Sequence, residues 1–145
     1  MASLLELVVN QPSRTLAPDE ILIAQGEEGG DLFILERGKL LIERDGVELA
    51  TLSIPGTVVG EMSVLTGTRH SATVRAAAES RLKMVRDAAK ELQTDPQLTF
   101  RLAALVASRL EATSGELVAM QRDAALKGAQ GVFSRLTAAL HISPR

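Results

Sequence analysis

The sequence GEMSVLTGTRHSATV at residues 60–74 is the part of the chain from which its fold can be inferred. A glycine such as Gly60 before a short helix lets an anion approach the backbone, and the free N–H groups at the helix N-terminus form a site for that anion. Glu61 adds a carboxylate that can accept a hydrogen bond from a ligand hydroxyl. A glycine and a glutamate alone are a weak signal, because an ordinary helix start with a capping charge has the same sequence. The residues around this stretch are therefore needed to distinguish a ligand site from an ordinary helix start.

Turn residues recur about every 8 to 12 positions through the first 85 residues, which is typical of an all-β sandwich or barrel. The runs between them are rich in Ile, Leu and Val, and Asp45-Gly46 between two such runs favours a two-residue hairpin. The predicted strands are residues 21–24, 31–36, 39–44, 47–53, 71–76 and 80–85. We expect an antiparallel β-roll of jelly-roll type over about residues 13–85, preceded by an N-terminal helix.

From Arg86 onward the hydrophobic period changes from two to about 3.6, which indicates helices. The pattern predicts a short helix over 86–93 and a long one that starts at Asp95-Pro96 and runs to about Leu126. One stripe, Leu98, Leu102 and Leu105, is suited to packing on the roll. The fold class is therefore α+β: a β-roll with short flanking helices and a long C-terminal helix, forming one domain over 1–126, followed by a helical tail over 127–145 with an amphipathic helix at 130–140.

A second stripe on the long helix has the alternating spacing of four and three that is typical of a coiled-coil seam. It consists of Val106, Leu110, Thr113, Leu117, Met120 and Ala124. This predicts a homodimer through the helix at about 96–126. The alternative is a wide stripe that packs only within one chain.

Composition excludes several classes of function. The 145 residues include no cysteine, so disulfides and thiolate chemistry are excluded, and His70 and His141, the only histidines, lack a metal-ligand spacing. We therefore expect no metal, no cofactor and no cupin-like enzyme. No membrane span or signal peptide is evident, so we expect a cytoplasmic protein. The net charge of -2 offers no general attraction for nucleic acid.

The motifs together resemble those of a known family. Residues 60–65 and 69–74 resemble the phosphate-binding cassette of cyclic-nucleotide-binding domains, and the turns at Gly26-Glu27 and Pro55-Gly56 fall at that family's turn positions. Residues 109–114 are similar to the dimer helix of the catabolite activator proteins, in the Crp/Fnr superfamily. The resemblance covers about residues 14–126 and implies a sensor domain that responds to cAMP or, less favoured, cGMP.

The resemblance also implies roles for individual residues. Glu61 would take the ribose 2'-hydroxyl, while Gly60, Met62 and Ser63 would bind the cyclic phosphate, and Thr113 and Ser114 would reach the adenine amino group, one from each protomer. For these two hydroxyls the alternative is a hydrogen bond to the carbonyl four residues back. The predicted ligand-binding residues are Gly60, Glu61, Met62, Ser63, Arg69, His70, Ser71, Thr113 and Ser114.

The chain departs from the family pattern at the phosphate. His70 stands where the family usually has arginine, and Arg69 where it has proline. An imidazole is fully charged only below neutral pH and lacks the guanidinium fork, so phosphate affinity should fall. Two alternatives remain: Arg69 or a protonated His70 still binds a cyclic nucleotide, or the pocket takes another ligand or none.

The functional expectation is a regulatory sensor and not an enzyme. Binding of a cyclic nucleotide would move the C-terminal helices and change what the dimer presents to an unknown protein partner. The alternatives are a ligand-free dimerisation or interaction module, and the sensor fragment of a longer Crp/Fnr regulator. Because too little chain follows the long helix for a two-helix DNA reader, we expect no direct DNA binding by this chain.

Overall fold

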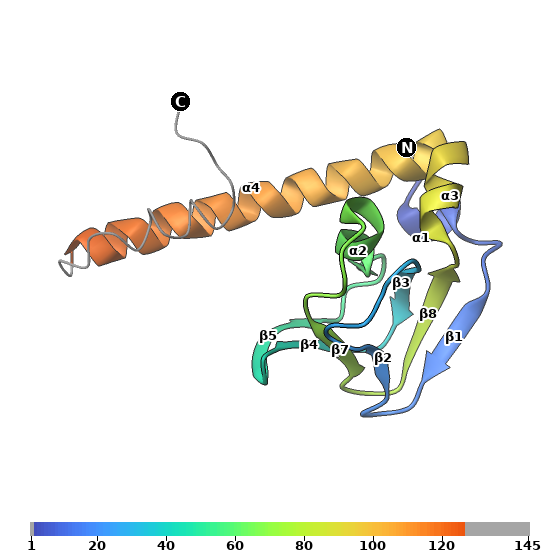
Figure 1. Ribbon diagram of the computed structural model, residues 1–145, viewed down its shortest axis with the longest axis horizontal. Helices are drawn as coiled ribbons and strands as arrows, with labels where there is room; N and C mark the ends of the chain where they lie inside the picture. Colours follow the sequence, from blue (N-terminus) through green and yellow to red (C-terminus); the bar gives the residue numbers. More distant parts are fainter. Residues whose placement is uncertain (1, 127–145) are drawn as a thin grey trace. The chain divides into compact units, whose positions relative to one another are not determined.

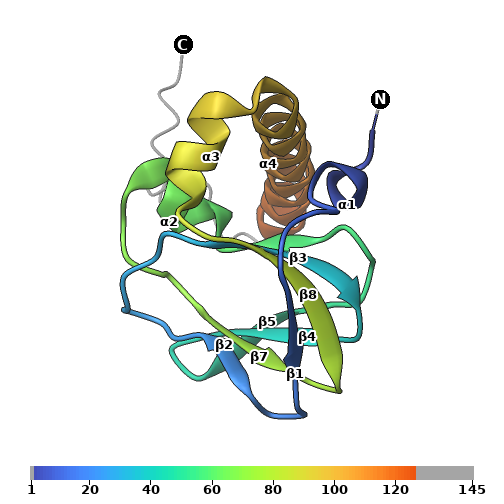
Figure 2. The same cartoon turned by 90° about the vertical axis from the view of Figure 1, so that its right-hand side faces the viewer.

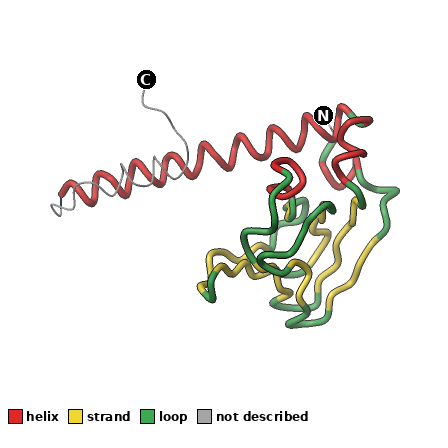
Figure 3. Tube along the Cα trace, viewed as in Figure 1, coloured by secondary structure: helices red, strands yellow, loops and turns green. Residues whose placement is uncertain are grey.

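The computed structural model describes residues 2–126, and Figures 1 and 3 show a β-rich part followed by helices. Residues 4–85 carry α1 and eight short strands, with α2 between the sixth and the seventh. The elements are α1 (Leu4–Leu7), β1 (Ser13–Leu16), β2 (Ile21–Ile23), β3 (Leu32–Arg37), β4 (Leu40–Arg44), β5 (Val47–Leu52), β6 (Val58–Val59), α2 (Glu61–Thr66), β7 (Thr73–Ala76), β8 (Ser80–Val85), α3 (Ala88–Thr94) and α4 (Pro96–Leu126).

The strands form two antiparallel sheets of four, which confirms the predicted α+β fold with a β-roll. The strand orders are β1-β8-β3-β6 and β2-β7-β4-β5, and Figure 2 shows both sheets below α1, α2 and α3. All six predicted strands are present, with ends within two residues of those expected. The expected strand at 71–76 begins only at Thr73, since Ser71 and Ala72 form a bend. The strands β1 and β6 were not predicted, because β1 is mostly polar and β6 has only two residues.

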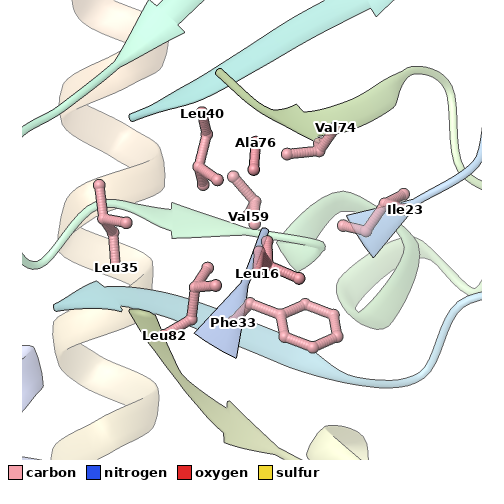
Figure 4. Close-up of a cluster of buried hydrophobic side chains, with 9 residues drawn as sticks. All are labelled: Leu16, Ile23, Phe33, Leu35, Leu40, Val59, Val74, Ala76 and Leu82. Atoms are coloured by element: carbon pink, nitrogen blue, oxygen red, sulfur yellow. The ribbon is translucent and has the colours of Figure 1, made fainter. Parts of the chain in front are cut away.

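The core lies between the two sheets. Nine buried side chains from seven strands meet there, and Figure 4 shows them pointing toward one another. Burying one such leucine contributes on the order of 1.5–3 kcal/mol. The nine are Leu16, Ile23, Phe33, Leu35, Leu40, Val59, Val74, Ala76 and Leu82.

Local signals decide two further features as predicted. Asp45 and Gly46 both have positive φ, at 51° and 77°, and form the tight turn between β4 and β5. The carboxylate of Asp95 accepts a hydrogen bond of 3.1 Å from the N–H of Leu98 and so caps α4.

On β7, Arg75 donates to Glu43 of β4 and to Asp19, and the hydrogen bond to Glu43 raises the pKa of Arg75.

The chain divides into two compact units, Met1–Leu102 and Ala103–Arg145, so the boundary falls within α4. In the first unit Leu98 and Leu102 are buried, and in the second Leu105 is half-buried. On the predicted seam Leu110 is 55% exposed and Met120 is 54% exposed. The predicted helix at 130–140 lies outside the described residues, and the domain division into 1–126 and 127–145 stays a prediction.

Within residues 2–126, no helix has both the length and the hydropathy needed to cross a membrane.

Candidate functional site

The short helix α2 is flanked by two glycines whose backbone conformation other residues rarely adopt. Gly60 before it has φ 88° and Gly67 after it has φ 69°, both in the left-handed region. A Cβ on Gly60 would also lie 2.7 Å from the carbonyl oxygen of Asp31. The absence of a side chain therefore lets the start of α2 lie directly against the loop that connects β2 and β3.

Along α2, alternate residues differ sharply in exposure. Glu61 and Ser63 are buried, whereas Met62 is 57% exposed. A glutamate is rarely buried without a specific role or partner. Burial therefore limits the positions that the side chain of Glu61 can take.

Ser63 connects α2 to His70. Its hydroxyl donates to the carbonyl of Gly60 at 3.1 Å and lies 3.3 Å from Nδ1 of His70. The same hydroxyl therefore contacts both the start of α2 and the imidazole ring. Ser63 thereby orients the imidazole of His70.

The β2–β3 loop is joined to the segment that carries Arg69 and His70. The N–H of His70 donates to the carbonyl of Glu27 at 2.9 Å, and the N–H of Gly26 donates to the carbonyl of His70 at 2.8 Å. A Cβ on Gly29 would lie 2.1 Å from Oγ of Ser63 and 2.9 Å from Cε1 of His70. The sequence analysis assigned Gly29 no role in the site, so it is a site residue that was missed.

The two candidate cations, Arg69 and His70, line different pockets. Arg69 shares a pocket of about 380 Å³ with Glu28, Gly29, Ser63, Gly67 and Thr68. His70 lies on a neighbouring hollow of about 240 Å³ whose charged residues are Arg14, Glu27, Glu28 and Asp31. Glu28 and Gly29 line both hollows.

The structure brings most of the predicted site residues into one place, and the others lie elsewhere. Gly60 through Ser63 form the start of α2, which contacts His70 through Ser63, and Ser71 is exposed just before β7. Thr113 and Ser114 lie in the second unit. The hydroxyl of Thr113 donates to the carbonyl of Arg109 at 2.9 Å, which is the alternative bond to the carbonyl four residues back.

No group of three or more metal-ligating side chains occurs among the residues that the structure describes.

Comparison with known proteins identifies the family. The family model for the cyclic nucleotide-binding domain matches residues 13–91 of the 145. The chain belongs to the cyclic nucleotide-binding domain family. The match includes both sheets, α2 and the segment with Arg69 and His70.

Two solved structures are similar to this cyclic nucleotide-binding domain. The catabolite activator protein of Thermus thermophilus has a TM-score of 0.68 and 27% identity, over 81% of this chain and 58% of that one. The N-terminal domain of a transcriptional regulator from Streptomyces coelicolor A3(2) has a TM-score of 0.58 and 29% identity, over 77% of this chain and 81% of that one. These matches confirm the expected similarity to catabolite activator proteins.

A channel protein is similar over a shorter stretch. A cyclic nucleotide-gated cation channel subunit of Drosophila melanogaster is 39% identical over an alignment 84 residues long, which covers 52% of this chain. The chain spans only 12% of the length of that relative. Domains similar to this one therefore occur within much longer proteins.

Proposed function

We propose that this domain binds cAMP in preference to cGMP and acts as a regulatory sensor and not as an enzyme. The observation that carries the proposal is the burial of Glu61 and Ser63 on α2, with His70 held against Ser63. These side chains belong to the part of the chain that the family match covers. The preference for cAMP is what the resemblance of residues 109–114 to the dimer helix of the catabolite activator proteins implies.

The proposed roles follow from the chemistry of each group. The carboxylate of Glu61 accepts a hydrogen bond from the ribose 2'-hydroxyl, and the backbone of Gly60, Met62 and Ser63 binds the cyclic phosphate. Arg69 and a protonated His70 supply the positive charge, with Ser71 beside them. In the homodimer, Thr113 and Ser114 contact the adenine through their free lone pairs.

The effect of ligand binding would be transmitted through the contacts of α2, the helix of the phosphate-binding cassette. α2 contacts α3, which leads within one residue into α4. A ligand that binds one arrangement of these helices more tightly than another shifts the population toward the first. We propose that the shift alters a homodimer formed through residues 96–126 in the cytoplasm, and that the reader of this change is a protein and not DNA.

A second candidate function is a ligand-free dimerisation module. The observation that favours it is the imidazole in place of a guanidinium at position 70, together with the pairing of Arg69 with Glu28. A third candidate, the sensor part of a longer Crp/Fnr regulator, is consistent with the 58% of the Thermus protein that this chain spans.

Calorimetric titration with cAMP and with cGMP separates the sensor from the ligand-free module. Glu61→Ala should weaken cAMP binding by about tenfold or more, because a hydrogen bond to a charged group contributes about 1.5–3 kcal/mol. Glu48→Ala is the matched control, since Glu48 is exposed on β5 outside the site. Nucleotide affinity that is equal in both variants would contradict the assignment of Glu61, and no binding by the unmodified chain would favour the ligand-free module.

A further inference from the structure

The ion pair between Glu28 and Arg69 lies at the proposed ligand site. Nη2 of Arg69 is 3.3 Å from Oε1 of Glu28, and Nη1 donates to the carbonyl of Gly26 at 3.1 Å. Both side chains line the pocket that Ser63 also lines. The guanidinium that shares this pocket with the phosphate-binding helix is therefore already occupied by a carboxylate.

We propose that Glu28 competes with the ligand phosphate for Arg69, so that nucleotide binding exchanges one anion for another and Glu28 sets the affinity of the site. This inference rests on the proposed function. It assigns to Arg69 the role of phosphate ligand and to Glu28 the role of an internal competitor.

The backbone holds the two side chains near each other. The carbonyl of Glu27, next to Glu28, accepts from the N–H of His70, and the carbonyl of His70, next to Arg69, accepts from Gly26. Gly29 on the other side of Glu28 lies against Ser63. Since loop and cassette are fixed to each other at these points, the pairing of Glu28 with Arg69 needs little additional ordering of the chain.

The pair is suited to exchange because it is exposed. The side chain of Arg69 is 65% exposed and that of Glu28 is 82% exposed, so water weakens their attraction. A phosphate can accept two parallel hydrogen bonds from a guanidinium, which a single contact at 3.3 Å does not provide. A bound phosphate would also lie close to Glu28, and this like-charge repulsion would add to the effect of the competition.

The test is a double-mutant cycle on cAMP affinity, measured by calorimetry at low salt with the unmodified chain, Glu28→Gln, Arg69→Gln and the double variant. We expect Glu28→Gln to tighten cAMP binding about three- to tenfold and Arg69→Gln to weaken it. In the Arg69→Gln background, Glu28→Gln should give a clearly smaller gain, because only the repulsion between Glu28 and the phosphate remains. Raising the salt concentration should reduce the gain, since both charges are exposed.

The matched control is Glu79→Gln. Glu79 forms a similar exposed ion pair with Arg37, at 3.8 Å, outside the pocket. This variant should leave cAMP affinity unchanged and shows whether net charge alone matters.

The outcomes separate this inference from the proposed function. If the unmodified chain binds cAMP but Glu28→Gln leaves the affinity unchanged or weakens it, the competition is refuted and the sensor function stands. An equal gain from Glu28→Gln with and without Arg69 would also refute competition, because it would show simple repulsion of the phosphate. Binding by none of the four proteins would refute both.

Discussion

Gly29 offers the sharpest test of how the β2–β3 loop supports the site. In Gly29→Ala the new Cβ would lie 2.1 Å from Oγ of Ser63, 2.7 Å from Cβ of Ser63 and 2.9 Å from Cε1 of His70. Carbon atoms pack best at roughly 3.5–4.0 Å, so the loop or α2 must move by about 1 Å. Overpacking of this kind costs about 1–3 kcal/mol of folding free energy.

The same displacement should reduce nucleotide binding. Because Ser63 and His70 are both proposed ligand-binding residues, a shift of about 1 Å should weaken cAMP binding about ten- to hundredfold. Urea unfolding measures the loss of stability and calorimetry the loss of affinity. The control is Gly115→Ala on α4, where a Cβ meets no heavy atom within 4 Å. It should leave stability unchanged or raise it by up to about 1 kcal/mol.

A compensating change tests whether the contact with Ser63 is the cause. Ser63→Gly removes both serine atoms from the collision and leaves only the ring of His70, which can rotate. The variant with both Gly29→Ala and Ser63→Gly should therefore be more stable than the sum of the two single changes predicts. Unchanged stability and affinity in Gly29→Ala would refute the reasoning, as would strict additivity in the double variant.

Three further predictions concern the charge, the core and the dimer. His70→Arg should bind cAMP more tightly than the unmodified chain, because a guanidinium is always charged and can donate a forked pair of hydrogen bonds to a phosphate. Calorimetry that shows no gain in affinity would contradict a phosphate contact at position 70. Leu82→Ala should lower the free energy of unfolding, measured in urea, by about 2–5 kcal/mol, since Leu82 is fully buried between the sheets. A loss below about 1 kcal/mol would show that the core tolerates the cavity. Leu110→Glu should dissociate a homodimer formed through the predicted seam, because it places a charge among the apolar seam residues, whereas Glu111→Gln, one position away, should not. Sedimentation that shows the same mass for both variants would contradict the seam.

Much of the fold was predictable because its signals are local. The Asp45-Gly46 turn requires two residues of positive φ, and the cap at Asp95 is a hydrogen bond between residues only three positions apart in the sequence. The strands β1 and β6 were missed for the opposite reason. Strand β1 forms by pairing with β8, and β6 forms by pairing with β3. The sequence of a short polar or two-residue segment does not indicate such a pairing.

The site divides in the same way. Residues 60–71 contain the glycine, the glutamate and the cationic positions in one continuous stretch, so their resemblance to the phosphate-binding cassette of cyclic-nucleotide-binding domains was visible in the sequence. The buried state of Glu61 and Ser63 and the contact between Ser63 and His70 required the folded chain.

By itself, then, the sequence determined the β-roll, the long helix and the departure at His70. Only the tertiary structure decided that the β2–β3 loop belongs to the site, with Gly29 against Ser63 and Glu28 on Arg69. The physical reason is distance along the chain: Glu28 and Arg69 are 41 residues apart and meet only because the backbones of the two segments are hydrogen-bonded to each other. No local periodicity or turn preference carries that information.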